Sequence, residues 1–502
     1  MKKLLTLLLC CCTALNVLGS TYYIDDKKGD DTFDGHSPAK AWRSLYGVNK
    51  QVFEAGDSIL FKRGGVWEGQ LVPMGSGTVK APIVFGAFGS GALPEIKANG
   101  HFKDAVLLKN LQNIVVQYLS LSNFDSTVPF QKTGPTGVRV LAEDIGTLYN
   151  IRLANLYVHD INGDNKKGSA EGYGIFWDCQ GPKPSNIEHL LIENCKVERV
   201  DRNGIRGNGT FSFRTKWFPN KYLVIRNCLL DDIGGDGIVV KAFDTAMVEH
   251  NKLFHIRTRA KDNAVAIWPH SSDNTVIQYN EVAYTQNDNW ANDGQSFDID
   301  GNSRNTIIQY NYSHDNEGGF MLVISDLINK DNVMTTGNII RYNLSVNDGL
   351  NRKRLFNFAG VTDSTVVKGN IFYNDGSKSY TTEVADIENG IPDHVSFDDN
   401  YFLFAGKNAA VFSKSPKQYS KVIFNNNVFA GNIVGLDNLS NLKGLSKVKS
   451  NRPKVLPKSK FFPWMYLPAK VRALVPDFPE SLYQSYTSNG SRDKCISVGQ
   501  VK

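Results

Sequence analysis

The chain has 502 residues, of which 41% are hydrophobic, 21% are charged and 44 are glycine. This composition is typical of a globular, turn-rich protein and excludes wholesale disorder. The formal net charge of +6 falls to about +4 without Lys2 and Lys3 (6 − 2 = 4), which is too small to indicate nucleic-acid binding but is compatible with an acidic glycan.

The N-terminus has the pattern of a cleavable signal peptide. A charged start at residues 1–3 precedes an apolar stretch at residues 4–18, and small or permissive residues allow cleavage near Gly19 or Ser20. No later apolar run reaches the ~20 residues that a membrane helix needs. We therefore predict a signal peptide over residues 1–19 and a secreted or periplasmic monomer without a transmembrane segment.

Residues 20–105 are expected to form an N-terminal strand and cap region. Strand patterns at 21–26, 57–62 and 83–88 alternate with polar turns, such as the cluster at 29–35. A stack of strands needs such a cap because its end exposes unpaired backbone groups and apolar core.

From about residue 110 a short motif recurs, consisting of an apolar pair, one to three mostly polar residues and an asparagine. The asparagines follow one another at intervals of 24 to 33 positions: Asn194, Asn227, Asn251, Asn280, Asn311, Asn343, Asn370, Asn400 and Asn427. Several short strands within each period indicate a stack of coils, which predicts an all-β parallel β-helix over residues 106–435. The asparagine side chains should bond to the backbone of the neighbouring coil.

A second strand follows a turn in each coil, at 174–178, 204–208, 237–241, 264–268, 296–300, 319–323 and 355–359. Alternation predicts that the second and fourth residues of each, such as Val265 and Ile267, or Phe320 and Leu322, point inward. Two outward columns then follow. The first runs Phe176, Arg206, Val239, Ala266, Asp298, Met321, Asn357, and the second runs Asp178, Asn208, Lys241, Trp268, Asp300, Val323, Ala359.

The stretch Asp298-Ile-Asp300 is the main candidate for chemistry. Strand propensity disfavours aspartate and neighbouring negative charges repel, so local stability does not explain it. A solvated strand face or a calcium site at these two residues is one interpretation, and a catalytic carboxylate pair in a groove is the other. Glycoside hydrolysis needs one protonated and one ionised carboxyl group, and crowding should separate their pKa values. We predict Asp298 and Asp300 as this pair, with Asp293 as the third candidate.

Other polar and aromatic residues fall near these aspartates. Trp268 is expected either to stack on a sugar ring or to pack beneath a loop, and His270 either to transfer protons or to be an ordinary surface residue. The predicted substrate-binding residues are Trp268, Arg206, Asp178, Asn208, Asp236, Asn263 and Glu317.

The asparagine motifs and the stretch at 305–320 resemble the right-handed, single-stranded parallel β-helix proteins of the pectate-lyase-like superfamily, over residues 110–430. This resemblance implies a bacterial secreted protein that acts on polysaccharides, although the superfamily includes lyases, hydrolases, epimerases and tail-spike proteins.

Three subfamilies allow a closer comparison. Residues 237–241 are similar to alginate lyase and chondroitinase B relatives, in which a lysine is the base, but the arginine of their next coil is replaced here by Trp268-Pro-His270. Polygalacturonases have Gly-His-Gly and Arg-x-Lys motifs that this chain lacks. Lacto-N-biosidases of the β-helix type use two aspartates seven positions apart, a spacing that Asp293 and Asp300 reproduce.

We therefore expect a secreted glycoside hydrolase that acts on a polysaccharide or oligosaccharide without a cofactor. The first alternative is a lyase in which Lys241 is the base, and Arg206 or a calcium ion on Asp298 and Asp300 neutralises a uronate. Nearby aspartates should raise the pKa of Lys241, which argues against this alternative. The second alternative is a non-catalytic glycan-binding repeat protein. Residues 436–502 are expected to form an irregular C-terminal tail packed on the β-helix.

Overall fold

A computed structural model describes residues 19–124, 134–168, 170–209, 214–288, 291–325, 333–351, 354–374, 376, 381–404, 409–439, 442–443 and 446–447. The predicted signal peptide up to residue 18 lies outside the described residues, as does the C-terminal tail from residue 448. The boundaries expected for these two segments stay predictions.

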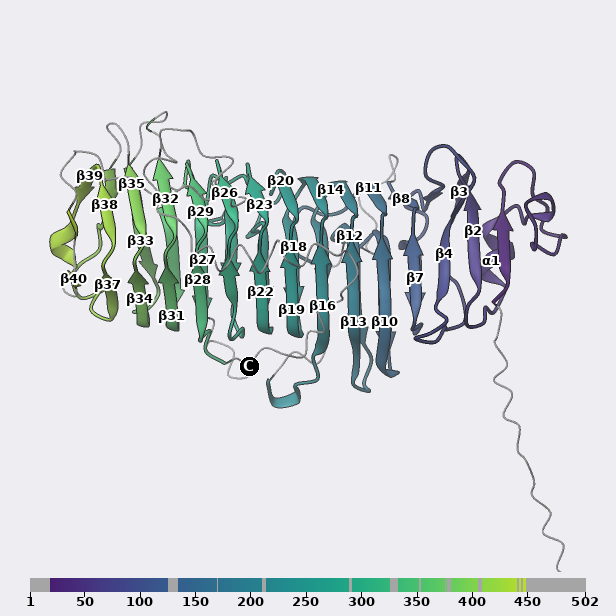
Figure 1. The fold of residues 1–502 in the computed structure, drawn as a ribbon, viewed down its shortest axis with the longest axis horizontal. Helices are drawn as coiled ribbons and strands as arrows, with labels where there is room; N and C mark the ends of the chain where they lie inside the picture. Colours follow the sequence, from purple (N-terminus) through teal and green to yellow (C-terminus); the bar gives the residue numbers. More distant parts are fainter. Residues whose placement is uncertain are drawn as a thin grey trace, which may run out of the picture.

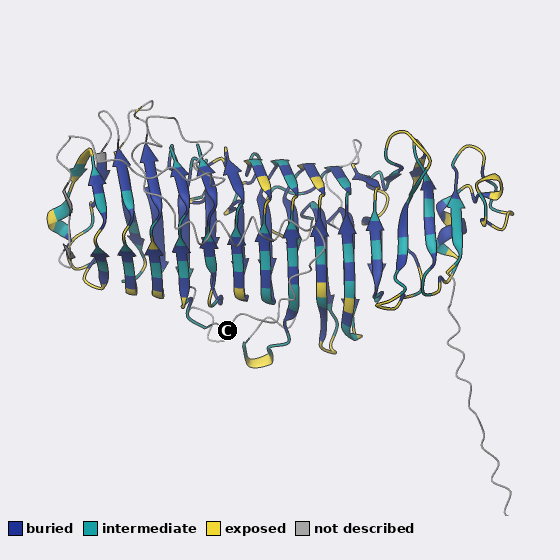
Figure 2. Ribbon diagram, in the orientation of Figure 1, coloured by how far each residue is buried: buried dark blue, intermediate teal, exposed yellow. Residues whose placement is uncertain are grey.

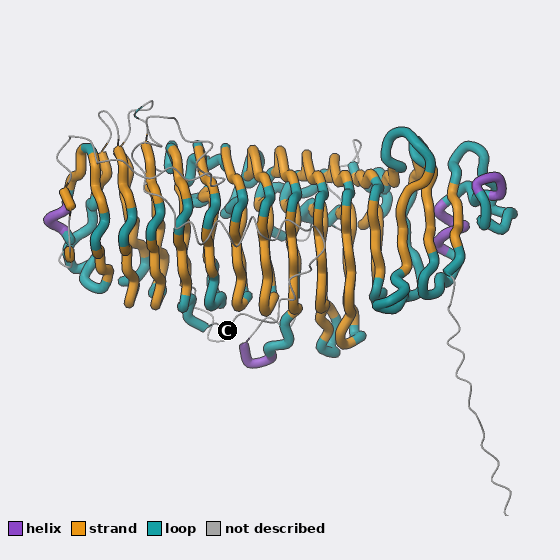
Figure 3. The backbone as a smooth tube through the Cα atoms, viewed as in Figure 1, coloured by secondary structure: helices purple, strands orange, loops and turns teal. Residues whose placement is uncertain are grey.

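The described strands wind into an elongated stack of coils (Figures 1 and 3) that forms three parallel sheets of 15, 14 and 12 strands. Each strand pairs with its counterpart one coil before and one coil after it, which is the arrangement of a parallel β-helix. The expected fold class is thus confirmed.

The first sheet contains β1 (Thr21–Ile24), β2 (Ser58–Lys62), β4 (Ile83–Phe88), β7 (Ile114–Gln117), β10 (Gly146–Ala154), β13 (Ser185–Glu193), β16 (Asn220–Arg226), β19 (Phe243–Glu249), β22 (Asp273–Gln278), β25 (Ile307–Gln309), β28 (Asn338–Arg341), β31 (Asp363–Lys368), β34 (Asp393–Asp398), β37 (Val422–Asn425) and β40 (Leu442–Lys443). The second contains β3 (Val66–Glu68), β5 (Glu95–Lys97), β8 (Ser120–Asn123), β11 (Tyr157–Ile161), β14 (Lys196–Val200), β17 (Leu229–Ile233), β20 (Lys252–Ile256), β23 (Glu281–Ala283), β26 (Tyr312–His314), β29 (Leu344–Val346), β32 (Ile371–Asn374), β35 (Tyr401–Phe404), β38 (Val428–Ala430) and β41 (Ser446–Lys447).

The third sheet contains β6 (Asp104–Lys109), β9 (Thr136–Glu143), β12 (Tyr173–Gln180), β15 (Asn203–Gly207), β18 (Asp236–Lys241), β21 (Ile267–His270), β24 (Gln295–Ile299), β27 (Gly319–Ser325), β30 (Arg354–Gly360), β33 (Thr381–Glu388), β36 (Ala409–Val411) and β39 (Asn432–Val434). Helix α1 (Leu45–Asn49) lies at the N-terminal end of the stack in Figure 1. The described residues also form three short 3₁₀ turns, which are η1 (Pro38–Lys40), η2 (Arg214–Lys216) and η3 (Leu436–Asn438).

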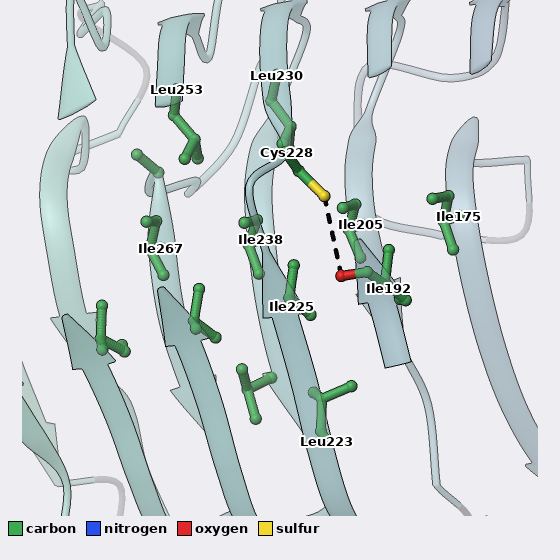
Figure 4. Close-up of a cluster of buried hydrophobic side chains, with 14 of the residues drawn as sticks. Ile175, Ile192, Ile205, Leu223, Ile225, Cys228, Leu230, Ile238, Leu253 and Ile267 are labelled. Carbon is green, nitrogen blue, oxygen red and sulfur yellow. Dashed lines mark hydrogen bonds between the residues drawn. The ribbon is translucent and has the colours of Figure 1, made fainter. Parts of the chain in front are cut away.

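Apolar side chains from all three sheets fill the interior of the stack, and buried positions run along the strands in Figure 2. In the close-up of Figure 4, Ile205 and Ile238 of the third sheet face Ile225 of the first sheet and Leu230 of the second. Burying these side chains stabilises the coils, because each fully buried aliphatic side chain contributes roughly 1.5–3 kcal/mol. Cys179, Cys195 and Cys228 are buried in the same core.

An asparagine ladder runs along the corner between the first and second sheets, from Asn251 to Asn427. The Asn311 Nδ2 donates to the Ile277 carbonyl and to Asn343 Oδ1, both at 3.0 Å. The Asn311 Oδ1 accepts from the backbone N–H of Asn280 at 2.9 Å and from its Nδ2 at 3.0 Å. These bonds satisfy buried polar groups where the chain bends between sheets.

The prediction that the ladder begins at Asn194 and Asn227 is wrong by one residue. Both asparagines are exposed and adopt a left-handed backbone with φ of 54°, a conformation that asparagine tolerates well. Cys195 and Cys228 lie at the inward position instead, and the Cys228 N–H donates to Asn251 Oδ1 at 2.9 Å. The Cys228 thiol points toward the Ile192 carbonyl (Figure 4) at 4.0 Å.

The register of the third sheet also differs from the prediction in two coils. Val239 pairs with Trp268, and Asp298 pairs with Leu322. Ala266 and Met321 therefore lie in the core, whereas Val265 packs with Val239 and Trp268 in a separate cluster. The chain places two consecutive residues inward where it enters these strands, Ala266 with Ile267 and Phe320 with Met321, so simple alternation fails there. A shift of one residue moves a side chain to the opposite face.

Candidate active site

The candidate site lies on the outward face of the third sheet, over strands β15 to β24. Lys241 pairs with His270, and the Asp300 N–H donates to the Pro269 carbonyl at 3.2 Å. Lys241, His270 and Asp300 therefore follow one another on three successive coils, spaced by about 4.8 Å. The neighbouring outward column runs through Arg206, Val239, Trp268, Asp298 and Leu322.

Three carboxyl groups gather at one end of this site, on β24 and the residues that flank it. The Asp298 side chain is 3% exposed, and its Oδ1 has no hydrogen-bond partner among the described residues. Burial, together with repulsion from Asp300 and Asp293, raises the pKa of Asp298 well above its usual value. The neutral form of Asp298 is therefore favoured.

Asp293 and Asp300 titrate closer to neutral pH than an ordinary aspartate. Burial is the main cause and raises the pKa of each to about 6. For Asp300, a hydrogen bond from the Gly301 N–H at 2.5 Å opposes the shift. For Asp293, the charge of Lys167 opposes it and that of Asp236 adds to it. Two carboxyl groups that titrate in this range are suited to proton transfer.

Two cationic side chains, Arg206 on β15 and Lys241 on β18, lie at the other end of the site. Burial, followed by repulsion from Arg206 and Lys167, lowers the pKa of Lys241 to about 8. Asp300 raises this pKa, as expected of a nearby aspartate, but burial outweighs its attraction, so the expected net rise is wrong. Arg206 donates from Nη1 to Glu171 Oε2 at 3.0 Å and to Asn203 Oδ1 at 3.1 Å.

His270 is a neutral imidazole in this environment. Burial and the charge of Lys241 lower its pKa to about 3, and its Nδ1 lies 2.9 Å from Ser271 Oγ. A histidine with this pKa does not carry a proton near neutral pH. It is therefore better suited to hydrogen bonding than to acid catalysis.

Trp268 is 6% exposed and packs against Val239 and Val265. Its Nε1 donates to Asp236 Oδ1 at 3.0 Å, and Lys167 Nζ lies 5.5 Å from the centre of its ring. Of the two environments expected for Trp268, the structure shows packing beneath a loop. Trp268 supports the site from below and is not an open sugar-stacking surface.

Lys167 and Glu171 belong to the site but carry no sequence signal. Both lie between β11 and β12, in a stretch without strand periodicity. The Lys167 N–H donates to Asp262 Oδ2 at 2.6 Å, and Glu171 Oε2 accepts from Asn203 Nδ2 at 2.7 Å. Lys167 lowers the pKa of all three aspartates, so this loop brings positive charge over the carboxyl groups.

The remaining predicted binding residues fall into three groups. Asp236 and Glu317 are tied into the framework, because Asp236 forms an ion pair with Arg202 at 2.9 Å and Glu317 Oε2 accepts from the Asn287 N–H at 2.7 Å. Asn208 and Asn263 are exposed. Asp178 lies four strand steps from Asp298, which is about 19 Å, so it does not join the three aspartates.

The calcium alternative at Asp298 and Asp300 stays a prediction. Within the described residues, no three or more His, Cys, Asp and Glu side chains are grouped so that they could hold a metal ion.

Among the residues that the structure describes, no helix has the length and apolarity that crossing a bilayer requires.

The pKa of Asp293 predicts how stability depends on pH. Because its folded pKa is raised, its stabilising contribution is complete below the unfolded pKa of 3.8 and is lost as the pH rises through about 6. The loss amounts to about 3 kcal/mol. Asp293→Asn should therefore flatten the fall in melting temperature between pH 4 and pH 7.5, as measured by circular dichroism. The exposed Asp34→Asn should leave the profile unchanged, and a profile equally steep in Asp293→Asn would contradict this assignment.

The first comparison with known proteins supports the fold class, a parallel β-helix. A family profile described as "Right handed beta helix region" matches residues 103–282. Together with the three parallel sheets, this makes the chain a right-handed parallel β-helix protein.

More particular similarities point to carbohydrate-active enzymes. The chain is 25% identical over 478 residues to a lacto-N-biosidase of Bifidobacterium longum subsp. longum, covering 77% of this chain but only 29% of that longer protein. The crystal structure of a GH136 lacto-N-biosidase from Eubacterium ramulus is similar with a TM-score of 0.60 and 26% identity, covering 74% of this chain and 68% of that chain.

Proposed function

We propose that this protein is a glycoside hydrolase that cleaves an oligosaccharide on the outward face of the third sheet. The observation that carries the proposal is the cluster of Asp293, Asp298 and Asp300, in which burial raises every pKa. The similarity to two lacto-N-biosidases supports a glycosidase over other enzyme classes.

The two aspartates with a pKa of about 6 are the proposed acid and base. One donates a proton to the leaving oxygen, and the other activates water or attacks the anomeric carbon. Because each of these groups disfavours ionisation of the other, the first proton leaves at a lower pH than the second. Asp298, neutral and almost fully buried, is proposed to position this pair as a hydrogen-bond donor.

A second candidate function is a lyase, which one observation favours. The pKa of Lys241 is about 8, within the range of a general base, and Arg206 on the preceding coil of the third sheet could neutralise a uronate.

Product analysis distinguishes the two reactions. We expect the protein, incubated with a panel of plant, algal and host oligosaccharides that includes lacto-N-biose-terminated chains, to release reducing ends without ultraviolet-absorbing products. The rate should be greatest at roughly pH 6, where one carboxyl of the pair is protonated and the other is ionised. Absorbance from an unsaturated uronide would establish the lyase, and binding without any product would indicate a glycan-binding protein. A loss of activity in a chelator would support the calcium alternative.

A further inference from the structure

Among the described residues, Lys241 has no ion-pair partner, unlike the buried cation next to the site. Arg202, which is fully buried next to the site, forms ion pairs with Asp236 at 2.9 Å and Asp262 at 2.8 Å. By contrast, among the described residues no carboxylate oxygen lies within the 4.0 Å ion-pair distance of Lys241 Nζ. Holding a partly buried ammonium group without a partner is unfavourable, and a bound anion would remove this cost.

The neighbouring carboxylates are already engaged. Glu171 accepts from Arg206 and Asn203 with Oε2, and from the Gly168 N–H at 2.8 Å with Oε1. Asp300, the carboxylate that most raises the pKa of Lys241, accepts from its neighbour Gly301. Both carboxylates therefore hold hydrogen bonds that are directed away from Lys241.

Arg206 faces the same region, with donors that no described residue uses. Its bonds to Glu171 and Asn203 both come from Nη1, and within the described part of the chain no bond involves its Nη2 or Nε. Arginine presents these two donors in a fork that matches the oxygens of a carboxylate or sulfate. Lys241 lies on the next coil, about 5 Å further along the sheet.

We propose that Arg206 and Lys241 form an anion subsite that binds a carboxylate or sulfate group of the glycan. The inference rests on the proposed function in one respect, namely that a glycan lies across this face. Lys241 and Asp300 are two strand steps apart, about 10 Å, so the charged sugar is the one beside the cleaved bond or one residue beyond it. The substrate is therefore an anionic oligosaccharide.

Binding measurements in a non-hydrolysing background test this proposal. In the full chain carrying Asp300→Asn, calorimetry compares a galacturonate hexasaccharide with its methyl ester, and a sulfated galactan oligosaccharide with its desulfated form. One of the two anionic ligands should bind about tenfold more tightly than its neutral counterpart, as expected for a charge-assisted hydrogen bond. The ligand that shows this difference identifies carboxylate or sulfate as the recognised group.

Variants of Lys241 show whether the difference arises at this subsite. Lys241→Gln should reduce it to about twofold or less while leaving affinity for the neutral ligand unchanged, and Lys241→Arg should retain it. Lys252→Gln is the matched control, because Lys252 is half exposed on β20 of the second sheet and pairs with Glu281. Equal affinity for charged and neutral ligands, or a preference that survives Lys241→Gln, would overturn the proposal.

The binding test of the anion subsite can succeed or fail independently of the activity test of the proposed hydrolase. A Lys241-dependent preference in a protein that cleaves no glycan would uphold the subsite and reject the hydrolase. Cleavage of neutral glycans by the unmodified protein, without any charge preference, would uphold the hydrolase and reject the subsite.

Discussion

Asp300→Asn should lower kcat by about a thousandfold, while the protein stays folded. Asparagine cannot donate or accept the proton that acid–base catalysis requires, and such steps typically contribute 10²–10⁴-fold. The backbone around residue 300 is held by the Asp300 N–H bond to Pro269, which the substitution preserves. Because the pKa of Asp300 is raised to about 6, its negative charge is unfavourable at pH 7.5, and the melting temperature of the variant should equal or exceed that of the unmodified protein.

Initial rates and thermal melts of purified variants check this expectation. The matched control is Asp231→Asn on β17, an aspartate of the second sheet that is 41% exposed and bonds to His255, and it should retain full activity. Asp293→Asn should lose activity to a similar extent as Asp300→Asn. Activity within about twofold of the unmodified protein in Asp300→Asn would exclude this residue from the proposed chemistry.

The second large effect concerns stability. Asn311→Ala should lower the free energy of unfolding by about 4 kcal/mol, because it leaves the Asn280 N–H, the Ile277 carbonyl and part of Asn343 without partners in the core. Urea denaturation followed by circular dichroism measures the loss. Each buried group left unsatisfied costs roughly 1–3 kcal/mol.

A partly exposed asparagine provides the comparison for this effect. Asn425 on β37 donates to Asp398 Oδ1 at 2.7 Å outside the core, and water can replace that bond. Asn425→Ala should therefore cost about 1 kcal/mol or less. Similar losses in the two variants would show that the ladder contributes no more than an ordinary side-chain contact.

Repetition allowed the fold to be predicted from the sequence. The recurring apolar pair places a strand in each coil, and the asparagine that follows marks the bend between the first and second sheets, as at Asn280 and Asn311. The same pattern misplaced the ladder at Asn194 and Asn227. There cysteine, which behaves as a small apolar residue, takes the inward position, and the motif alone does not distinguish the two neighbouring positions.

The site was predicted less completely, for three physical reasons. Alternation identified the outward Asp298 and Asp300, but Ala266 and Ile267 both point inward where the chain enters β21, so Trp268 lies beside Val239 and His270 beside Lys241. Lys167 and Glu171 come from a loop without periodicity, and their positions depend on tertiary contacts such as the Lys167 bond to Asp262. Nor does sequence reveal that burial outweighs Asp300 in setting the pKa of Lys241.

The asparagine ladder and the candidate site occupy different sides of each coil. The ladder joins the first and second sheets, whereas the aspartates and cations belong to the third sheet and its loops. Evolution can therefore change the sequence of surface loops such as residues 162–172, and with it the sugar that the protein recognises. Such changes leave the asparagine ladder undisturbed. Relatives with the same β-helix can therefore differ in the sugars that they recognise while keeping one architecture.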